Sequence, residues 1–129
     1  MKVVLDTSVL ISRTLPAISN ADAYVASLCF AELELGVATA TDAAERAMRQ
    51  ARIDRFRTVF GPGLPFSDEA AAAYGQFCSI VLAAGRSPRS RAIDLMIAAT
   101  AYVNDAGVVT RNISDFADLR KIVPIIDAS

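Results

Sequence analysis

The sequence contains no histidine, and this absence excludes more chemistry than any other feature of its composition. Without histidine there is no Ser-His-Asp triad, no Cys-His pair and no histidine-ligated zinc site. Tryptophan is also missing, and aromatic residues make up only 7% of the chain, so small aliphatic side chains must fill the core. No apolar run approaches the roughly 20 residues of a membrane-spanning helix. We therefore expect neither histidine-based catalysis nor a membrane partner.

Cysteine is scarce as well. Cys29 and Cys78 do not have the spacing of a metal site, and both lie among apolar residues. We interpret them as reduced thiols of the core. The N-terminus reaches Asp6 too early for a signal peptide. These features predict a cytoplasmic protein.

Length and composition fit one compact domain, residues 1–129, because 53% of the 129 residues are hydrophobic. The net charge of −1 comes from 13 basic and 14 acidic residues. Eleven of the 13 basic residues are arginine, the side chain best suited to bidentate phosphate contacts. The composition therefore permits a polyanionic partner without requiring one.

Short apolar segments alternate with helical patterns along the chain. Strands are predicted at residues 3–5, 24–26, 64–66, 108–110 and 122–126. Helices are predicted at 9–15 (capped by Thr7 or Ser8 and stopped by Pro16), 28–38 (capped by Ser27), 42–60 (capped by Thr41), 67–84 and 92–105 (ended by Gly107), with a turn at 20–22. The alternation predicts an α/β fold, with a mostly parallel sheet of four or five short strands between helices.

Four acidic residues lie beside or within apolar segments: Asp6, Glu32, Asp94 and Asp115. A carboxylate in apolar surroundings is costly unless it is paired or metal-bound. In open parallel sheets, ligands bind outside the carboxyl ends of the strands, and Asp6 and Asp115 lie just past the ends of two predicted strands. Together the four would form a strongly negative pocket that cations would relieve.

Each acid also has an ordinary structural explanation. Asp6 could cap the next helix, and Asp115 could serve a turn or a cap, with Asp118 as a competitor one turn later. Glu32 and Glu34 lie about 200° apart on a helix whose two faces are both apolar, so periodicity does not choose between them.

Asp94 is the hardest of the four acids to explain structurally. An acid in the first turn of a helix interacts favourably with the helix dipole. However, the following residues, 95–99, are apolar on every side, which is typical of a buried helix. A carboxylate at the head of such a helix is partly desolvated and needs a partner.

The acids lie in four segments that resemble PIN-domain nucleases, specifically the VapC-type toxin ribonucleases of VapBC toxin–antitoxin systems. The segments are VLDTSVLI at 4–11, AEL at 31–33 followed by Gly36, DLMIAATA at 94–101 and VTRNISDF at 109–116. Their order and spacing match from end to end of the chain. The resemblance implies a catalytic quartet of Asp6, Glu32, Asp94 and Asp115, and it selects Glu32 over Glu34.

The resemblance also implies the reaction. It predicts a Mg²⁺- or Mn²⁺-dependent ribonuclease that hydrolyses phosphodiesters of transfer or ribosomal RNA by attack of water. Asp6, Asp94 and Asp115 are the predicted direct metal ligands, with Glu32 acting through metal-bound water. The predicted substrate contacts are Thr110, Asn112, Arg89 and Arg91. The expected partners are a VapB-like antitoxin and a second copy of the chain.

Two other classes of protein remain as alternatives. The first is a catalytically weak PIN-fold protein that works only within an antitoxin–DNA repressor complex. The second is a phosphorelay receiver, which needs a lysine near the last strand, where Lys121 is the only candidate. An arginine at every third position from Arg46 to Arg55 also has three interpretations: a solvated helix face, an RNA backbone contact or an antitoxin contact.

Overall fold

A computed structural model describes residues 1–12 and 22–128 of the chain. The elements, in order, are β1 (Lys2–Leu5), α1 (Thr7–Leu10), β2 (Asp22–Tyr24), α2 (Ser27–Ala38), α3 (Ala43–Phe60), α4 (Asp68–Ala83), η1 (Arg89–Arg91), α5 (Ala92–Val103), β3 (Ala106–Thr110), η2 (Ile113–Leu119) and β4 (Ile125–Asp127), where η marks a 3₁₀ helix.

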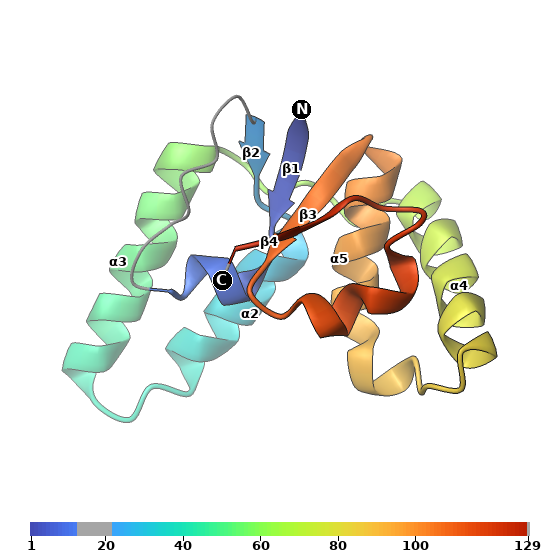
Figure 1. Cartoon of the computed structure of the whole chain (residues 1–129). Helices are drawn as coiled ribbons and strands as arrows, with labels where there is room; N and C mark the ends of the chain where they lie inside the picture. The colour runs from blue at the N-terminus through green and yellow to red at the C-terminus, as the bar shows by residue number, and fades with distance from the viewer. Residues whose placement is uncertain (13–21, 129) are drawn as a thin grey trace.

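The described strands form one parallel sheet in the order β2-β1-β3-β4. Figure 1 shows this sheet between two layers of helices, with α2 and α3 on one side and α4 and α5 on the other. All five residues of β3 are buried, as expected of a parallel strand that is covered on both faces. The predicted α/β class, with a parallel sheet between helices, is confirmed.

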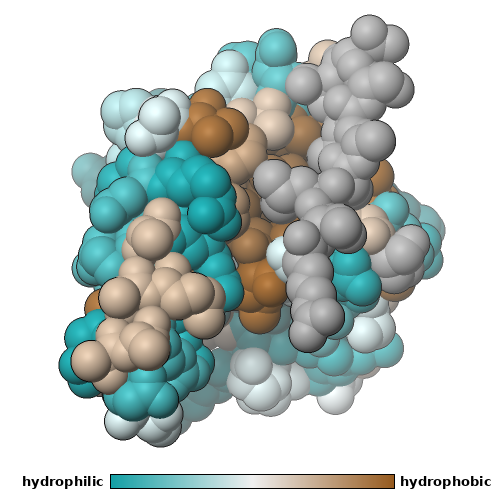
Figure 2. All heavy atoms as spheres, turned by 90° about the vertical axis from the view of Figure 1, so that its left-hand side faces the viewer, coloured by the Kyte–Doolittle hydropathy of each residue, from teal (hydrophilic) through white to brown (hydrophobic). Residues whose placement is uncertain are grey.

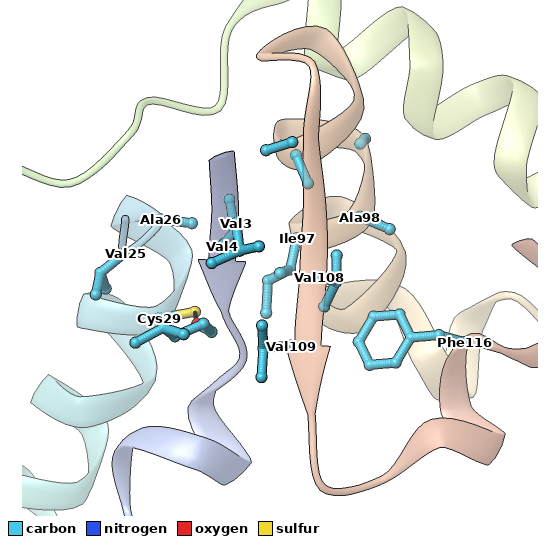
Figure 3. Packing of buried hydrophobic residues seen from close by; sticks show 14 of the residues in the cluster. Val3, Val4, Val25, Ala26, Cys29, Ile97, Ala98, Val108, Val109 and Phe116 are labelled. Atoms are coloured by element: carbon cyan, nitrogen blue, oxygen red, sulfur yellow. Dashed lines mark hydrogen bonds between the residues drawn. The ribbon is translucent and has the colours of Figure 1, made fainter. Parts of the chain in front are cut away.

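The core forms where small aliphatic side chains of the two central strands meet the helices. Figure 3 shows valines of β1 (Val3, Val4) and β3 (Val108, Val109) in this core, together with Cys29 of α2 and Ile97 of α5. All the residues labelled there are at most 1% exposed. The burial of Cys29 agrees with its prediction as a core thiol, while Cys78 is only partly buried. A core of this kind explains how the fold forms with few aromatic residues.

The strand order creates a crevice at one edge of the sheet. β1 pairs with β2 on one side and with β3 on the other, so the chain reverses direction across the sheet at β1. Such a switch point leaves a gap outside the carboxyl ends of the two strands, where the connections diverge. Asp6 directly follows β1, and Thr110 ends β3. The fold therefore brings residues about a hundred positions apart to one crevice.

Several predicted boundaries are wrong for local reasons. The helix predicted at 9–15 begins earlier, at Thr7, and its helical turn ends at Leu10. The rest of that prediction, with Pro16 and most of the predicted turn at 20–22, lies outside the described residues. Residue 22 itself begins β2. Thr7 and Ser8, which are predicted as caps, both belong to the helix.

Caps and short strands account for the other differences. Asp42, rather than Thr41, caps α3 by accepting a hydrogen bond from the Glu45 N–H. The predicted strand at 64–66 is a single bridge between Ala26 and Leu64. The predicted last strand shortens to Ile125–Asp127.

Gly107 was predicted to end the fifth helix, but it lies within β3. The helix instead ends near Asp105, which has a positive φ of 54°. Gly107 is needed for a different reason, because a Cβ there would lie 2.9 Å from the Pro124 carbonyl oxygen. The close approach of that carbonyl leaves no room for a side chain. None of the helices in the described parts of the chain is long and apolar enough to span a membrane.

Candidate active site

A main-chain hydrogen bond joins β1 and β3 at the base of the crevice. The Asp6 N–H donates to the Val109 carbonyl at 2.9 Å, which continues the ladder between the two strands by one residue. Asp6 is only 4% exposed, so its carboxyl group is held at the floor of the crevice. A buried carboxyl group of this kind requires hydrogen-bond donors around it.

Two hydroxyl groups supply those donors. Ser8 Oγ donates to Asp6 Oδ2 at 2.8 Å, and Thr110 Oγ1 donates to the same oxygen at 3.0 Å. Asp6 occupies the N-cap position of α1, but its side chain makes no capping hydrogen bond. Asp6 therefore caps the helix through its main chain alone. Its carboxylate is not used as a cap and faces the crevice.

Each hydroxyl is itself oriented by a backbone amide. The Arg111 N–H donates to Ser8 Oγ at 3.1 Å, and the Asn112 N–H donates to Thr110 Oγ1 at 3.0 Å. Because each hydroxyl oxygen accepts from an amide, its single proton is directed to Asp6. Two short relays thus run from the loop after β3 to one carboxylate oxygen. Sequence reasoning missed the role of Ser8, although a hydroxyl residue beside an acid at a strand end is a usable signal.

Glu32 reaches the same crevice from α2. The Thr7 hydroxyl donates to Glu32 Oε1 at 2.5 Å, and Glu32 is partly buried. Glu34 is exposed on the other side of the helix. The structure therefore distinguishes the two glutamates, which periodicity alone could not do, and it places Glu32 beside the residue that follows Asp6.

Asp94 joins the group from the first turn of α5. Burial, together with the negative charges of Asp6, Asp115 and Glu32 in decreasing order, raises the pKa of its carboxyl group to about 7. Arg91 lowers the pKa of Asp94 but does not cancel the rise. The other three predicted acids therefore lie within electrostatic range of Asp94. We call these four residues the acidic cluster.

The structure also separates Asp115 from its competitor. Asp118 forms an ion pair with Arg86 of the loop after α4. Its other carboxylate oxygen is buried without a hydrogen-bond partner among the described residues. Asp115, three residues earlier on η2, is partly exposed and raises the pKa of Asp94. The ion pair of Asp118 therefore links η2 to the loop after α4, and Asp115 faces the other acids of the acidic cluster.

The four predicted substrate contacts differ in accessibility. Arg89 and Asn112 are exposed, and Arg91 is partly buried with Nη1 donating to the Ser114 carbonyl at 3.3 Å. Thr110, however, is fully buried, and its hydroxyl is used by Asp6 and by the Asn112 N–H. The structure thus corrects the prediction for Thr110, which positions Asp6 instead of facing a substrate. Direct contact remains a prediction for the other three.

Cys29 lies beside the acidic cluster but is not suited to chemistry. Burial, together with the charges of Asp6 and Glu32, raises the pKa of its thiol to about 12. Its Sγ donates to the Leu5 carbonyl at 3.6 Å. A thiol with such a pKa stays protonated at neutral pH and is a poor nucleophile or metal ligand. The chemistry of the crevice is therefore left to oxygen atoms.

The donor atoms of the acidic cluster suit hard divalent cations. Carboxylate and water oxygens are the preferred ligands of Mg²⁺ and Mn²⁺, and the pKa of Asp94 is raised by burial and by negative charge that Arg91 does not cancel. Within residues 1–12 and 22–128, no three acidic or cysteine side chains are grouped so that they could hold an ion between them. Mg²⁺ commonly takes only one or two carboxylates and keeps several waters, so the cluster fits such an ion without a closed shell.

Solved structures of toxin–antitoxin systems share this fold over nearly the whole chain. The chain is 31% identical to a member of the VapBC family, VapBC-5 from Mycobacterium tuberculosis, with a TM-score of 0.82 and 98% of each chain covered. It is 27% identical to FitAcB from Neisseria gonorrhoeae, with a TM-score of 0.79, covering 98% of this chain and 97% of that one.

VapBC2 from Rickettsia felis, solved bound to a DNA fragment from its promoter, supports the fold alone at 21% identity, with a TM-score of 0.81 and both chains fully covered. No family model matches the chain, and no curated protein matches it.

Proposed function

The chain belongs to the VapC family of PIN-domain toxins from VapBC toxin–antitoxin systems, and from this premise we propose that it is a Mg²⁺- or Mn²⁺-dependent endoribonuclease. Its reaction is the hydrolysis of phosphodiester bonds in RNA, and its site of action is the cytoplasm, where such RNA is found. Its activity is inhibited by a VapB-like antitoxin, and it works as a homodimer.

The acidic cluster is the observation that carries this proposal. Burial and the negative charges of Asp6, Asp115 and Glu32 all raise the pKa of Asp94, so three carboxyl groups repel the fourth in a partly desolvated crevice. A purely structural site would place a cation or several hydrogen-bond donors beside Asp94, whereas Arg91 alone lowers its pKa. Strongly perturbed carboxyl groups in a crevice at a strand switch point are typical of functional sites.

The protein's own residues give each carboxylate a distinct task. Asp6, Asp94 and Asp115 would hold the ion directly, and Glu32 would act through a water molecule. A bound divalent ion would lower the pKa of water and stabilise the negative charge on the phosphate. Ser8 and Thr110 fix the rotamer of Asp6, so that its carboxylate needs no reorganisation when charge develops.

The nucleophile, and with it the ends of the products, follows from the general bases that the chain contains. Attack by the ribose 2′-hydroxyl usually requires a general base such as histidine, which the chain lacks. Water as the nucleophile leaves a 5′-phosphate and a 3′-hydroxyl. Arg89 and Arg91, beside Asp94, are proposed to contact the substrate phosphates on this side of the crevice.

The experiment is cleavage of a labelled RNA by the purified chain, with Mg²⁺ or Mn²⁺ and with excess EDTA. We expect 5′-phosphorylated products with either metal and none with EDTA. The matched variants are Glu32→Gln, which should lose nearly all cleavage, and Glu34→Gln, which should stay within several-fold of the parent because Glu34 points away. Cleavage that persists in EDTA would contradict the metal-dependent reaction.

The main alternative is a catalytically weak protein that acts only within an antitoxin–DNA repressor complex. It predicts no cleavage with either metal by a chain that still binds its antitoxin. The same preparation therefore distinguishes the two functions.

A further inference from the structure

The four evenly spaced arginines of α3 fall into two groups with different surroundings. Arg49 forms an ion pair with Glu45 at 2.5 Å and donates to the Gly36 carbonyl at 2.5 Å. Arg46 donates to the Ala40 carbonyl at 3.4 Å. These two arginines link the start of α3 to the end of α2 and the loop that follows it. Their guanidinium groups therefore already have partners within the protein.

Arg52 and Arg55, one and two turns later, have no such partners. Neither lies within ion-pair distance of a carboxylate in the described parts of the chain. Arg52 Nη2 contacts the sulfur atom of Met48 at 3.5 Å, and Arg55 lies over the Phe56 ring with 5.4 Å to its centroid. Both guanidinium groups therefore keep most of their donors free for a ligand.

Both arginines line a cleft of about 420 Å³ between α1 and α3. The rest of its described lining is mostly apolar and includes Leu10, Ile11, Met48 and Phe56. Ile11 and Met48 are 54% and 53% exposed, and both line this cleft, so they give it an exposed apolar surface that could serve a contact. Figure 2, which faces the side of the molecule that carries α3, shows hydrophobic residues beside a hydrophilic surface.

This cleft continues to the acidic cluster. A second cleft, of about 400 Å³, has Thr7, Glu32 and Arg49 among its lining residues. The two clefts share Ile11, Met48 and Arg52, so they are adjoining parts of one groove. We call it the α3 groove. A chain molecule whose reacting bond lies at Glu32 and Asp6 could thus extend along the groove to Arg55.

We propose that the α3 groove binds the single-stranded RNA that flanks the scissile phosphate, with Arg52 and Arg55 contacting backbone phosphates and Ile11 and Met48 contacting bases. This inference rests on the proposed ribonuclease function and adds the path of the substrate. The acidic cluster repels phosphates, so a strand that enters it needs positive groups on its flank. Arginines interleaved with apolar side chains are the combination that binds single strands, because the backbone is charged and the base faces are apolar.

The test measures the salt dependence of RNA binding. A fluorescein-labelled single-stranded RNA of mixed sequence is titrated with the Asp94→Asn chain, which leaves the RNA uncut, at several salt concentrations. The double variant Arg52→Ala/Arg55→Ala in this background should bind several-fold more weakly. Its slope of log K against log salt should fall by about 1.4, since each phosphate contact to a single strand contributes about 0.7.

The matched control removes the same two charges elsewhere. Arg120 and Lys121 are both exposed beyond η2, and neither lines the α3 groove among the described residues. The variant Arg120→Ala/Lys121→Ala should therefore keep the parent's slope. The variant Arg52→Lys/Arg55→Lys, which keeps the charges, should retain most of the slope. Circular dichroism of all variants checks that they are folded.

An unchanged slope in Arg52→Ala/Arg55→Ala would overturn the inference, as would an equal fall in the control pair, which would indicate bulk charge. Weaker antitoxin binding with unchanged RNA binding would assign the groove to a protein partner instead, and would also overturn it. If the unmutated chain cleaves RNA while the double variant binds as the parent does, only the groove is wrong. If the unmutated chain neither binds nor cleaves RNA, the proposed function fails with it.

Discussion

Asp6 and Asp94 each place a carboxyl group in the crevice, but the surroundings of the two groups differ. Asp6 is almost fully buried, and two hydroxyl groups, each oriented by a backbone amide, donate to one of its oxygens. Asp94 is partly exposed, and it faces the negative charges of the three other acids. The fold thus stabilises the first carboxylate and destabilises the second. The difference separates residues that the fold needs from residues that only the function needs.

The largest expected effect is on the Asp6 side. Asp6→Ala leaves the Ser8 and Thr110 hydroxyls without their acceptor, so we expect the free energy of unfolding to fall by roughly 2 kcal/mol. Cleavage should also be lost. Thermal and urea unfolding measure the change, with Asp54→Ala on the exposed face of α3 as the control for removing a carboxylate. A variant as stable as the parent would mean that the hydroxyl relays contribute nothing to the fold.

The Asp94 side should respond to pH in the opposite sense to an ordinary carboxylate. The pKa of Asp94 rises from 3.8 to about 7 on folding, so the folded state binds the extra proton more tightly. Its contribution to stability is complete below about pH 4 and is lost as the pH rises through about 7. Without metal, we therefore expect the parent to gain stability relative to Asp94→Asn as the pH is lowered from 8 to 5.

The size of that pH effect is reduced by solvent. A shift of this size corresponds to at most about 4 kcal/mol, and screening of a partly exposed group reduces it to roughly a third to a half of that. Urea unfolding in EDTA at several pH values measures the difference between the two proteins. A constant difference across this range would show that the pKa of Asp94 does not rise on folding.

The smallest effect concerns the support of Glu32. Thr7→Val removes the hydroxyl that donates to Glu32 but keeps the shape of the side chain. Outer hydrogen bonds of this kind typically contribute about 10- to 100-fold to activity or metal affinity, so we expect cleavage to fall at least tenfold, with stability within about 1 kcal/mol. Thr7→Ser, which restores the hydroxyl, should recover most of the activity. Equal activity in the valine and serine variants would remove Thr7 from the site.

The contrast between the two aspartates also explains how much the sequence could predict. The order of strands and helices follows from short apolar runs and their caps, and the prediction of a parallel α/β sheet is confirmed because these signals are local. The end of α1 could not be predicted in the same way. Pro16 is a strong stop signal, but the helical turn ends six residues before it.

The contacts of the site depend on tertiary structure. Ser8 and Thr110 are separated by more than a hundred residues and meet only because β1 and β3 are neighbours. Similarly, Arg86 takes Asp118 away from the crevice, and no local pattern indicates this pairing. The family resemblance therefore selected the four carboxylates, while the groups that orient or repel them required the fold.

We conclude that the acidic cluster is a cation site whose negative charges destabilise the folded protein when no cation is bound. The most direct measurement is the shift in Tm that Mn²⁺ causes in the parent and in Asp94→Asn, at neutral pH and without RNA. An ion that binds only the folded state stabilises it by RT ln(1 + [L]/Kd), which is about 2.7 kcal/mol at 100 times Kd. The account predicts that Asp94→Asn melts no lower than the parent in EDTA, and that Mn²⁺ raises the Tm of the parent far more than that of the variant. Equal shifts in the two proteins, or a clearly lower Tm of the variant in EDTA, would contradict it.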